Sequence, residues 1–174
     1  QSIEPSDADI VGCTRSGLPW VVVGVPNRRQ RWIFPGIEST DLPLIGRKWC
    51  HGSVDCYGLV RSYYQQILNL DIPEFEREDD WWKTPGRNLY LDGFAAAGFA
   101  DLGPYEAPRQ HDVLVFKYNS KVPNHASIYL GAETMLHHVC GCLSTRTFFS
   151  QYWQRRLACV ARHGSQIDGH HIER

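Results

Sequence analysis

The feature that most constrains how this chain folds is the order of two hydrophobic periodicities. After Cys56, apolar residues recur with the spacing of an amphipathic helix, at Leu59, Val60, Tyr63, Ile67 and Leu70. From residue 112 onward, the spacing changes to the alternation of short β-strands. A helix that precedes a series of neighbouring strands predicts an α+β fold, with the helix packed on an antiparallel sheet.

The individual elements follow from the same pattern. Four strands are expected, over residues 112–118, 125–130, 135–139 and 157–161, and a short helix over 89–97. Asp55 is the expected cap of the helix at Cys56, with Ser53 as the alternative. The polar face of that helix would consist of Arg61, Ser62, Gln65, Gln66 and Asn69. Upstream, residues 18–25 have the composition of one buried strand.

Composition narrows the class of protein. The 174 residues suffice for one domain with a substantial core, or for one domain and a fragment of another. A formal net charge of -1 gives no reason to expect a nucleic-acid partner. No apolar run approaches the roughly 18 residues needed to span a bilayer. The first residues also lack the pattern of a secretory signal.

The 6 cysteines are expected to be mostly reduced, because a chain this rich in apolar residues does not need disulfides. A zinc site built from Cys50, Cys140, Cys142 and neighbouring histidines is disfavoured. Its C-x-C spacing is unlike that of structural zinc sites. We therefore expect neither a metal nor another cofactor.

Cys56 has the setting of a nucleophile. It directly follows a helix cap, where unpaired N–H groups and the helix dipole are expected to stabilise a thiolate and lower the thiol pKa. We therefore expect Cys56 to be the most reactive thiol of the chain. A nucleophilic cysteine needs a base, and His125, at the start of an expected strand, is the candidate. The alternative is that Cys56 is simply a small buried residue of the helix.

His137 and His138 follow on the next expected strand, and only one of them can lie on the face of His125. A three-residue connection over 131–133 would pair Ser127 with His137 and place His137 beside His125. A two-residue connection over 132–133 would bring His138 there instead. Ala132 and Glu133 lack the Asn-Gly or Gly-x character of tight loops, which favours the longer connection and His137.

Two segments resemble the motifs of the NlpC/P60 cysteine peptidases. Residues 55–60 (Asp-Cys-Tyr-Gly-Leu-Val) resemble the nucleophile motif of that family, and residues 124–131 (Asn-His-Ala-Ser-Ile-Tyr-Leu-Gly) resemble the strand that carries its histidine. The family places a third polar residue where His137 stands. The resemblance implies a papain-like fold, with a helix that carries Cys56 and a sheet that carries His125 and His137 as the other members of the catalytic set.

Two positions depart from the family pattern. Residues 110–113 (Gln-His-Asp-Val) stand where the family has a Pro-Gly-Asp-Leu turn, and Leu44 stands where it has a tyrosine that helps to form the oxyanion hole. The backbone N–H of Cys56 remains as a donor for that purpose.

The resemblance is closer to one branch of the family, the C-terminal domain of lambda-type phage tail assembly proteins, and it extends over residues 42–163. Five blocks carry it in the same order: GRKWCHGSVDCYGLVR (46–61), EREDDWWK (76–83), GRNLYLDGF (86–94), VPNHASIYLG (122–131) and MLHHV (135–139).

Proteins of this branch join the peptidase domain to a JAMM metallopeptidase domain. Ser6 and Asp9 resemble the S-x-x-D end of the JAMM metal-binding motif, whose histidines would lie upstream. We therefore expect residues 1–35 to be a truncated JAMM remnant that holds no zinc. Residues 36–48 are the expected linker, 49–164 the expected peptidase domain and 165–174 an expected flexible tail.

The resemblance also implies a function. Its substrates would be the peptide stems of peptidoglycan, and its partners other phage tail-tip proteins. The site of action would be a virion tail that is assembled in the host cytoplasm and acts at the cell wall or periplasm. The alternative is a structural tail-tip protein whose site is vestigial or processes other tail proteins. In that case the acidic, tryptophan-containing loop over 76–83 would be a docking surface.

Overall fold

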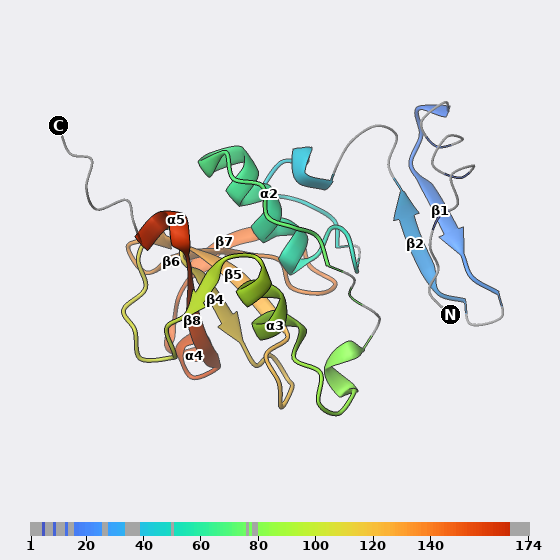
Figure 1. Cartoon of the computed structure of the whole chain (residues 1–174). Helices are drawn as coiled ribbons and strands as arrows, with labels where there is room; N and C mark the ends of the chain where they lie inside the picture. The colour runs from blue at the N-terminus through green and yellow to red at the C-terminus, as the bar shows by residue number, and fades with distance from the viewer. Residues whose placement is uncertain are drawn as a thin grey trace.

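The computed structural model describes residues 5, 9, 13, 16–25, 28–33, 39–49, 51–75, 77 and 80–167. Its main body is a six-stranded antiparallel sheet in the order β3-β8-β4-β5-β6-β7, with helices packed against it (Figure 1). The strands are β3 (Phe99–Asp101), β4 (Val113–Phe116), β5 (His125–Gly131), β6 (Thr134–His137), β7 (Thr145–Phe148) and β8 (Leu157–His163). This arrangement confirms the α+β class. The strands β3 and β7 were not expected from the sequence, because β3 has only three residues and β7 (Thr-Arg-Thr-Phe) lacks an apolar alternation.

The helices are η1 (Ser39–Asp41), α2 (Cys56–Leu68), η2 (Trp81–Lys83), α3 (Leu89–Ala96), α4 (Gln151–Gln154) and α5 (Gly164–Ile167). The two longest, α2 and α3, begin where the sequence predicts them. Among the described residues, no helix combines the length and the apolar character needed to cross a membrane.

The expected strand over residues 18–25 forms, but it is not buried. β1 (Trp20–Val23) pairs antiparallel with β2 (Gln30–Ile33) in a separate two-stranded sheet, which stands beside the main body in Figure 1. Trp20, Val21 and Val23 are 37%, 38% and 50% exposed. The prediction of burial is wrong. An apolar run indicates that a strand forms, but it does not show whether another layer of the protein covers that strand.

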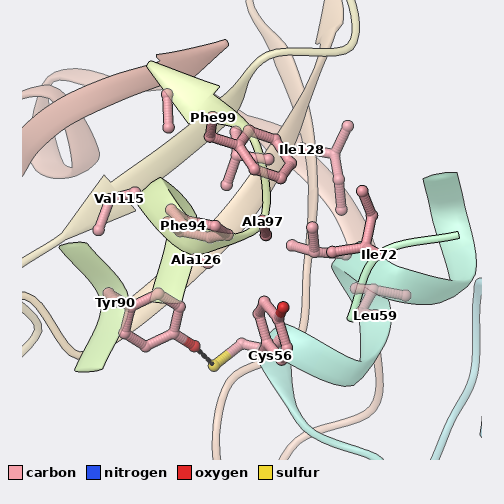
Figure 2. Close-up of a cluster of buried hydrophobic side chains, with 14 of the residues drawn as sticks. Cys56, Leu59, Ile72, Tyr90, Phe94, Ala97, Phe99, Val115, Ala126 and Ile128 are labelled. Carbon is pink, nitrogen blue, oxygen red and sulfur yellow. Dashed lines mark hydrogen bonds between the residues drawn. The ribbon is translucent and has the colours of Figure 1, made fainter. Parts of the chain in front are cut away.

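One face of the six-stranded sheet packs against α2 and α3. Alternate strand residues on this face, such as Val115, Ala126 and Ile128, join Leu59 of α2 and Phe94 of α3 in a single apolar cluster (Figure 2). Cys56 lies in the same cluster. The nucleophile candidate is therefore held at the boundary between the first turn of a helix and the sheet.

The helix α2 is buried on more sides than its periodicity indicated. Ser62, expected on the polar face, is fully buried and bonds to Nη1 of Arg47 at 2.7 Å and to the carbonyl of Gly58 at 2.8 Å. Ile67, expected on the apolar face, is 53% exposed. The difference arises because residues 39–48, including η1, cover a second side of the helix, as the bond from Gln66 to the carbonyl of Leu42 at 2.8 Å shows.

The opposite face of the sheet carries a second apolar cluster. Leu114, Phe116 and Met135 point to this side and pack against Trp153 of α4. This face is also that of His125 and His137, because both have ring contacts with Trp153. The sheet therefore separates the two apolar clusters. Because His125 is the first residue of β5, it lies at the end of the sheet where that strand begins.

A strained turn leads into β4 at the position where the family motif has Pro-Gly-Asp-Leu. His111 has a φ of 79°, a conformation that glycine adopts without strain. The hydroxyl of Tyr64 donates to the carbonyl of His111 at 2.6 Å, and the hydroxyl of Tyr63 lies 2.8 Å from Nδ1 of His111. Asp112 accepts bonds at 2.9 and 2.7 Å from Arg162. Tertiary hydrogen bonds thus hold a turn that the local sequence does not favour.

Candidate active site

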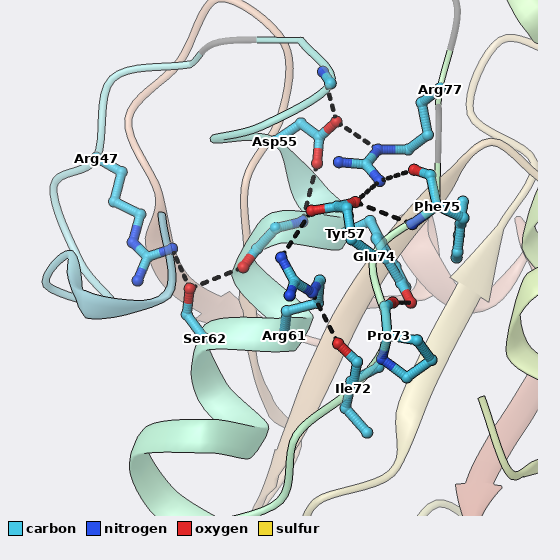
Figure 3. A network of polar contacts seen from close by, with 12 residues as sticks. Arg47, Asp55, Tyr57, Arg61, Ser62, Ile72, Pro73, Glu74, Phe75 and Arg77 are labelled. Carbon is cyan, nitrogen blue, oxygen red and sulfur yellow. Dashed lines mark hydrogen bonds and ion pairs between the residues drawn. The ribbon is translucent and has the colours of Figure 1, made fainter. Parts of the chain in front are cut away.

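The first turn of α2 is held by Asp55. Its Oδ1 accepts from the backbone N–H of Gly58 at 2.9 Å, which confirms Asp55 as the helix cap (Figure 3). Its Oδ2 accepts from the N–H of Gly52 at 2.9 Å and from Nε of Arg77 at 2.8 Å. Burial raises the pKa of the Asp55 carboxyl, but the charge and hydrogen bond of Arg77 and the N–H of Gly58 outweigh burial and leave that pKa lowered. An ionised, fully bonded cap therefore sets the direction in which Cys56 points.

Gly58 is required by the same turn. A Cβ atom at this position would lie 2.0 Å from the backbone oxygen of Ser53, far closer than atoms can approach. The obstruction is backbone, so it cannot be relieved by rotating a side chain. Any larger residue would displace the segment that leads into Cys56.

Cys56 and His125 line one cavity of about 240 Å³. Its other walls come from distant parts of the chain and include Trp49, Trp81, Trp82, Tyr90 and Tyr118, together with Arg77. Trp81 is 2% exposed and belongs to the core. The tryptophans of the loop over residues 76–83 thus form walls of the cavity, where the alternative expectation had placed an outward docking surface. Residues 76, 78 and 79 of that loop lie outside the described part of the chain.

His125 is held among aromatic rings. Its ring centroid lies 5.5 Å from that of Trp153, 5.8 Å from Tyr118 and 5.9 Å from Phe116. The ring of His137 lies 5.6 Å away at an interplanar angle of 71°. Nε2 of His125 and Nδ1 of His137 are both buried, and neither has a hydrogen-bond partner. His137 is not among the described residues that line the cavity. It therefore contacts the side of His125 that faces away from the cavity.

Burial shifts the acid–base properties of both members of the pair. It raises the pKa of the Cys56 thiol to about 11, and the charge of Asp55 adds to this effect, while hydrogen bonds from Tyr90 and the backbone of Ala126 oppose it. Burial lowers the pKa of His125 to about 3, with His137 and His138 adding to the shift. The expected lowering of the thiol pKa is therefore wrong. The loss of hydration outweighs the hydrogen bonds that favour the thiolate, so burial favours the neutral form of both Cys56 and His125.

The pairing of β5 with β6 brings His137, rather than His138, beside His125. Ser127 is paired with His137, as predicted. The predicted cause is wrong, because Gly131 pairs with Thr134 and leaves a two-residue turn of Ala132 and Glu133, both with positive φ. A bulge between Tyr129 and Gly131 then restores the predicted register.

His138 points to the other side of β6. Its Nε2 lies 3.2 Å from the carbonyl oxygen of Cys142, and its ring is edge-on to Trp49 at 5.1 Å. These contacts give His138 a packing role that is separate from the ring contact between His125 and His137.

The sequence did not identify Tyr90 or Arg77 as part of the site. The hydroxyl of Tyr90 lies 2.8 Å from Sγ of Cys56, and Arg77 binds the carboxylate that caps α2. Both residues are far from Cys56 along the chain, so no local pattern links them to it. Leu44, at the position of the family's tyrosine, packs against the apolar cluster and offers no donor.

The residues that were considered as metal ligands and set aside are only partly described. Ser6 and Cys50 lie outside the described residues, whereas Asp9 is described and half-buried. Cys140 and Cys142 are exposed free thiols. Within the described residues, no group of three or more His, Cys, Asp or Glu side chains is arranged to hold a metal ion. The JAMM assignment of residues 1–35 stays a prediction.

The sequence and the fold of this chain are similar to those of several known proteins. The sequence profile of the NlpC/P60 family matches residues 42–162. Tail tip assembly protein K of Escherichia phage lambda is 44% identical over 158 residues, which cover 91% of this chain and 74% of the phage protein. Tail tip assembly protein K of Escherichia phage N15 is 33% identical over 162 residues, which cover 92% of this chain and 64% of that protein. A solved lipoprotein-like member of the NLP/P60 family from Staphylococcus aureus subsp. aureus Mu50 is 18% identical. It superposes with a TM-score of 0.47, covering 72% of this chain and 38% of that one.

Proposed function

Because this chain belongs to the NlpC/P60 family, we propose that it is a cysteine peptidase with Cys56 as nucleophile, His125 as base and His137 as the residue that orients His125. The observation that carries the proposal is the shared cavity. Cys56, at the start of a capped helix, and His125, at the start of a strand, line the same cavity. A thiol and an imidazole on two rigid elements are the parts that acyl transfer requires.

The neutral state of the pair defines the first step. As Sγ of Cys56 attacks the carbonyl carbon of an amide, its proton passes to His125 and the carbonyl π electrons move onto oxygen. The oxyanion then reforms the carbonyl, the C–N bond breaks, and the proton on His125 goes to the departing amine. A water molecule gives a proton to His125 and attacks the carbonyl carbon of the resulting thioester, the C–S bond breaks, and the proton on His125 goes to Sγ. The products are a carboxylic acid and the restored thiol.

The two unpartnered ring nitrogens support the role of His137. A hydrogen bond from Nε2–H of His125 to Nδ1 of His137 would satisfy both buried atoms. That bond would fix the tautomer of His125 with its free lone pair on Nδ1, so that the lone pair is available to the thiol proton. His137 would therefore act as a positioning residue.

We propose that the substrate is the peptide stem of peptidoglycan, cut near a γ-D-glutamyl linkage. Two relatives are named tail tip assembly proteins, and a place at the tip of a tail would bring the site to the host wall. The site would then act at the cell wall or periplasm after tail assembly in the cytoplasm, with other tail-tip proteins as partners. Aromatic walls formed by Trp49, Trp81 and Trp82 suit the apolar faces of short peptides.

The names of the two relatives also favour a second candidate, a tail-tip assembly protein whose site cleaves other tail proteins or no substrate at all. The two functions differ in substrate. The first predicts release of soluble fragments from purified peptidoglycan, and the second does not.

The experiment is incubation of the purified chain with muropeptides, followed by mass spectrometry of the products. We expect pairs of new fragments whose summed mass exceeds that of the substrate by one water, and we expect none from Cys56→Ala. Cys142→Ala is the matched control, because it removes an exposed thiol. Equal product from wild type and Cys56→Ala would reject the peptidase assignment. Intact muropeptides together with cleavage of a tail protein would favour the second candidate.

A further inference from the structure

The side chain that contacts the sulfur of Cys56 most directly is Tyr90, the second residue of α3. Its Oη lies 2.8 Å from Sγ, and Figure 2 shows the hydroxyl pointing at the sulfur. Both residues also line the cavity of the candidate active site. The hydroxyl of Tyr90 therefore lies next to the sulfur of the proposed nucleophile and next to the space that a substrate would occupy.

The ring of Tyr90 is firmly held. The side chain is 1% exposed, and its centroid lies 5.4 Å from Phe94, 5.8 Å from Trp81 and 6.4 Å from Tyr57. These contacts fix the ring before any substrate arrives. The hydroxyl is therefore a preorganised dipole that needs only a small reorientation during a reaction.

The hydroxyl of Tyr90 is suited to donate rather than to ionise. Burial raises its pKa well above the ordinary value, and the neighbouring Cys56 and Asp55 add to this effect. It therefore keeps its proton near neutral pH. A buried tyrosine hydroxyl also needs a hydrogen-bond partner, and Sγ is the partner present.

We propose that Tyr90 is a catalytic residue that donates its hydrogen bond first to Sγ of Cys56 and then to the oxyanion of the tetrahedral intermediate. The inference rests on the proposed function, because it concerns the acyl transfer of that same site. When the Sγ–C bond forms, the oxyanion is attached to the carbon bonded to sulfur. A donor 2.8 Å from sulfur reaches it by a small shift. Tyr90 keeps its proton throughout, and the thiol proton moves by way of His125.

This role would replace the donor that Leu44 lacks at the position where the family pattern has a tyrosine. Leu44 lacks a donor and packs into the core cluster, so the hydroxyl at the sulfur comes from α3 instead. With the backbone N–H of Cys56, the hydroxyl would complete a two-donor oxyanion site.

The test compares Tyr90→Phe with wild type in two reactions of Cys56. Acylation by p-nitrophenyl acetate, followed as the burst of p-nitrophenolate that is lost in Cys56→Ala, passes through an oxyanion. Alkylation by iodoacetamide does not. We expect acylation to fall by about 10²-fold, as for other single oxyanion donors, and alkylation to change by less than about threefold. Tyr64→Phe is the matched control. It loses a buried hydroxyl that bonds to the carbonyl of His111 at 2.6 Å, away from the sulfur, and should keep both rates.

The outcomes separate this inference from the proposed function. Equal losses in acylation and alkylation would show that Tyr90 only adjusts the thiol, and unchanged acylation would show that it has no part in the reaction. Either result overturns the inference, as does the absence of any Cys56-dependent burst in the wild type. If muropeptides stay intact while ester acylation shows the Tyr90 effect, the peptidoglycan assignment fails and the inference stands. Circular dichroism and the urea midpoint of Tyr90→Phe establish that the retained ring preserves the fold.

Discussion

At Cys56, two effects act on the thiol in opposite directions. The helix N-terminus and the hydroxyl of Tyr90 favour the thiolate, whereas burial and the charge of Asp55 favour the protonated form. Burial dominates, because a thiolate that is 5% exposed has lost most of its hydration. Each pKa unit corresponds to about 1.4 kcal/mol, so the rise from 9.0 to about 11 exceeds the usual contribution of a helix terminus. Under the proposed function, the thiol would therefore be activated during attack, when His125 takes its proton, and not beforehand.

This protonation state predicts the pH dependence of alkylation. The rate of Cys56 modification by iodoacetamide should keep rising from pH 7 to pH 10, because the thiolate fraction grows as the pH approaches a pKa of about 11. The exposed Cys142 should be labelled earlier at pH 7, contrary to the expectation from helix position alone. Peptide mass mapping over a pH series measures both. A rate for Cys56 that is already constant from pH 5 would instead indicate a resting thiolate–imidazolium pair.

At the scale of elements, the hairpin of β5 and β6 decides which histidine joins the site. The turn at Ala132 and Glu133 contains two residues, which would bring His138 to the face of His125. The bulge at Tyr129 and Gly131 shifts the register by one residue and returns His137 to that face. The pairing of Ser127 with His137 is therefore the product of two irregularities that cancel.

The register predicts a difference between two neighbouring substitutions. His137→Ala should lower turnover of an amide or ester substrate at least tenfold more than His138→Ala, because only the ring of His137 lies 5.6 Å from that of His125. Alkylation of Cys56 should be largely retained in both variants, since neither histidine is among the described residues that line the cavity with Cys56. Steady-state kinetics and iodoacetamide labelling provide the two measurements. If His138→Ala were the more damaging for turnover, His138 would be the positioning residue.

At the scale of the whole molecule, the buried histidines connect the site to stability. Burial lowers the pKa of His125 from 6.5 to about 3 and that of His137 from 6.5 to about 4. As pH falls from about 6.5 toward 4, these residues bind protons in the unfolded chain but not in the folded one. Protonation therefore favours unfolding in this window.

We predict that the free energy of unfolding decreases as the pH is lowered from 7 to 5. Each of the two histidines should contribute at most about 1.4 kcal/mol per pH unit below its unfolded-state pKa. Urea unfolding at pH 7, 6 and 5 measures this slope. His137→Gln should make the slope shallower, because one of the histidines whose pKa is lowered by burial is removed. A stability that stays constant between pH 7 and pH 5 would contradict the buried, neutral state of the pair.

The local pattern of the sequence determined most of the helices and strands that carry the candidate site. The position of α2, its cap at Asp55, the strands β4, β5, β6 and β8, and the candidates Cys56 and His125 all follow from spacing and motif. These features depend on neighbours within a few residues, because helical and strand periodicities repeat over that distance. The choice of His137 over His138 came from the expected hairpin connection and from the resemblance to a known family, and the pairing of Ser127 with His137 agrees with it.

Only the tertiary structure decided what surrounds the sulfur. Tyr90 and Arg77 reach the start of α2 from other segments, and no periodicity relates them to Cys56. The same packing removes water from Cys56 and His125 and so reverses the expected shift of the thiol pKa. The exposure of β1 and the strained turn at His111 are likewise set by which layers and hydrogen bonds lie nearby. Burial, hydration and partner choice are properties of three-dimensional neighbours, which a one-dimensional pattern does not contain.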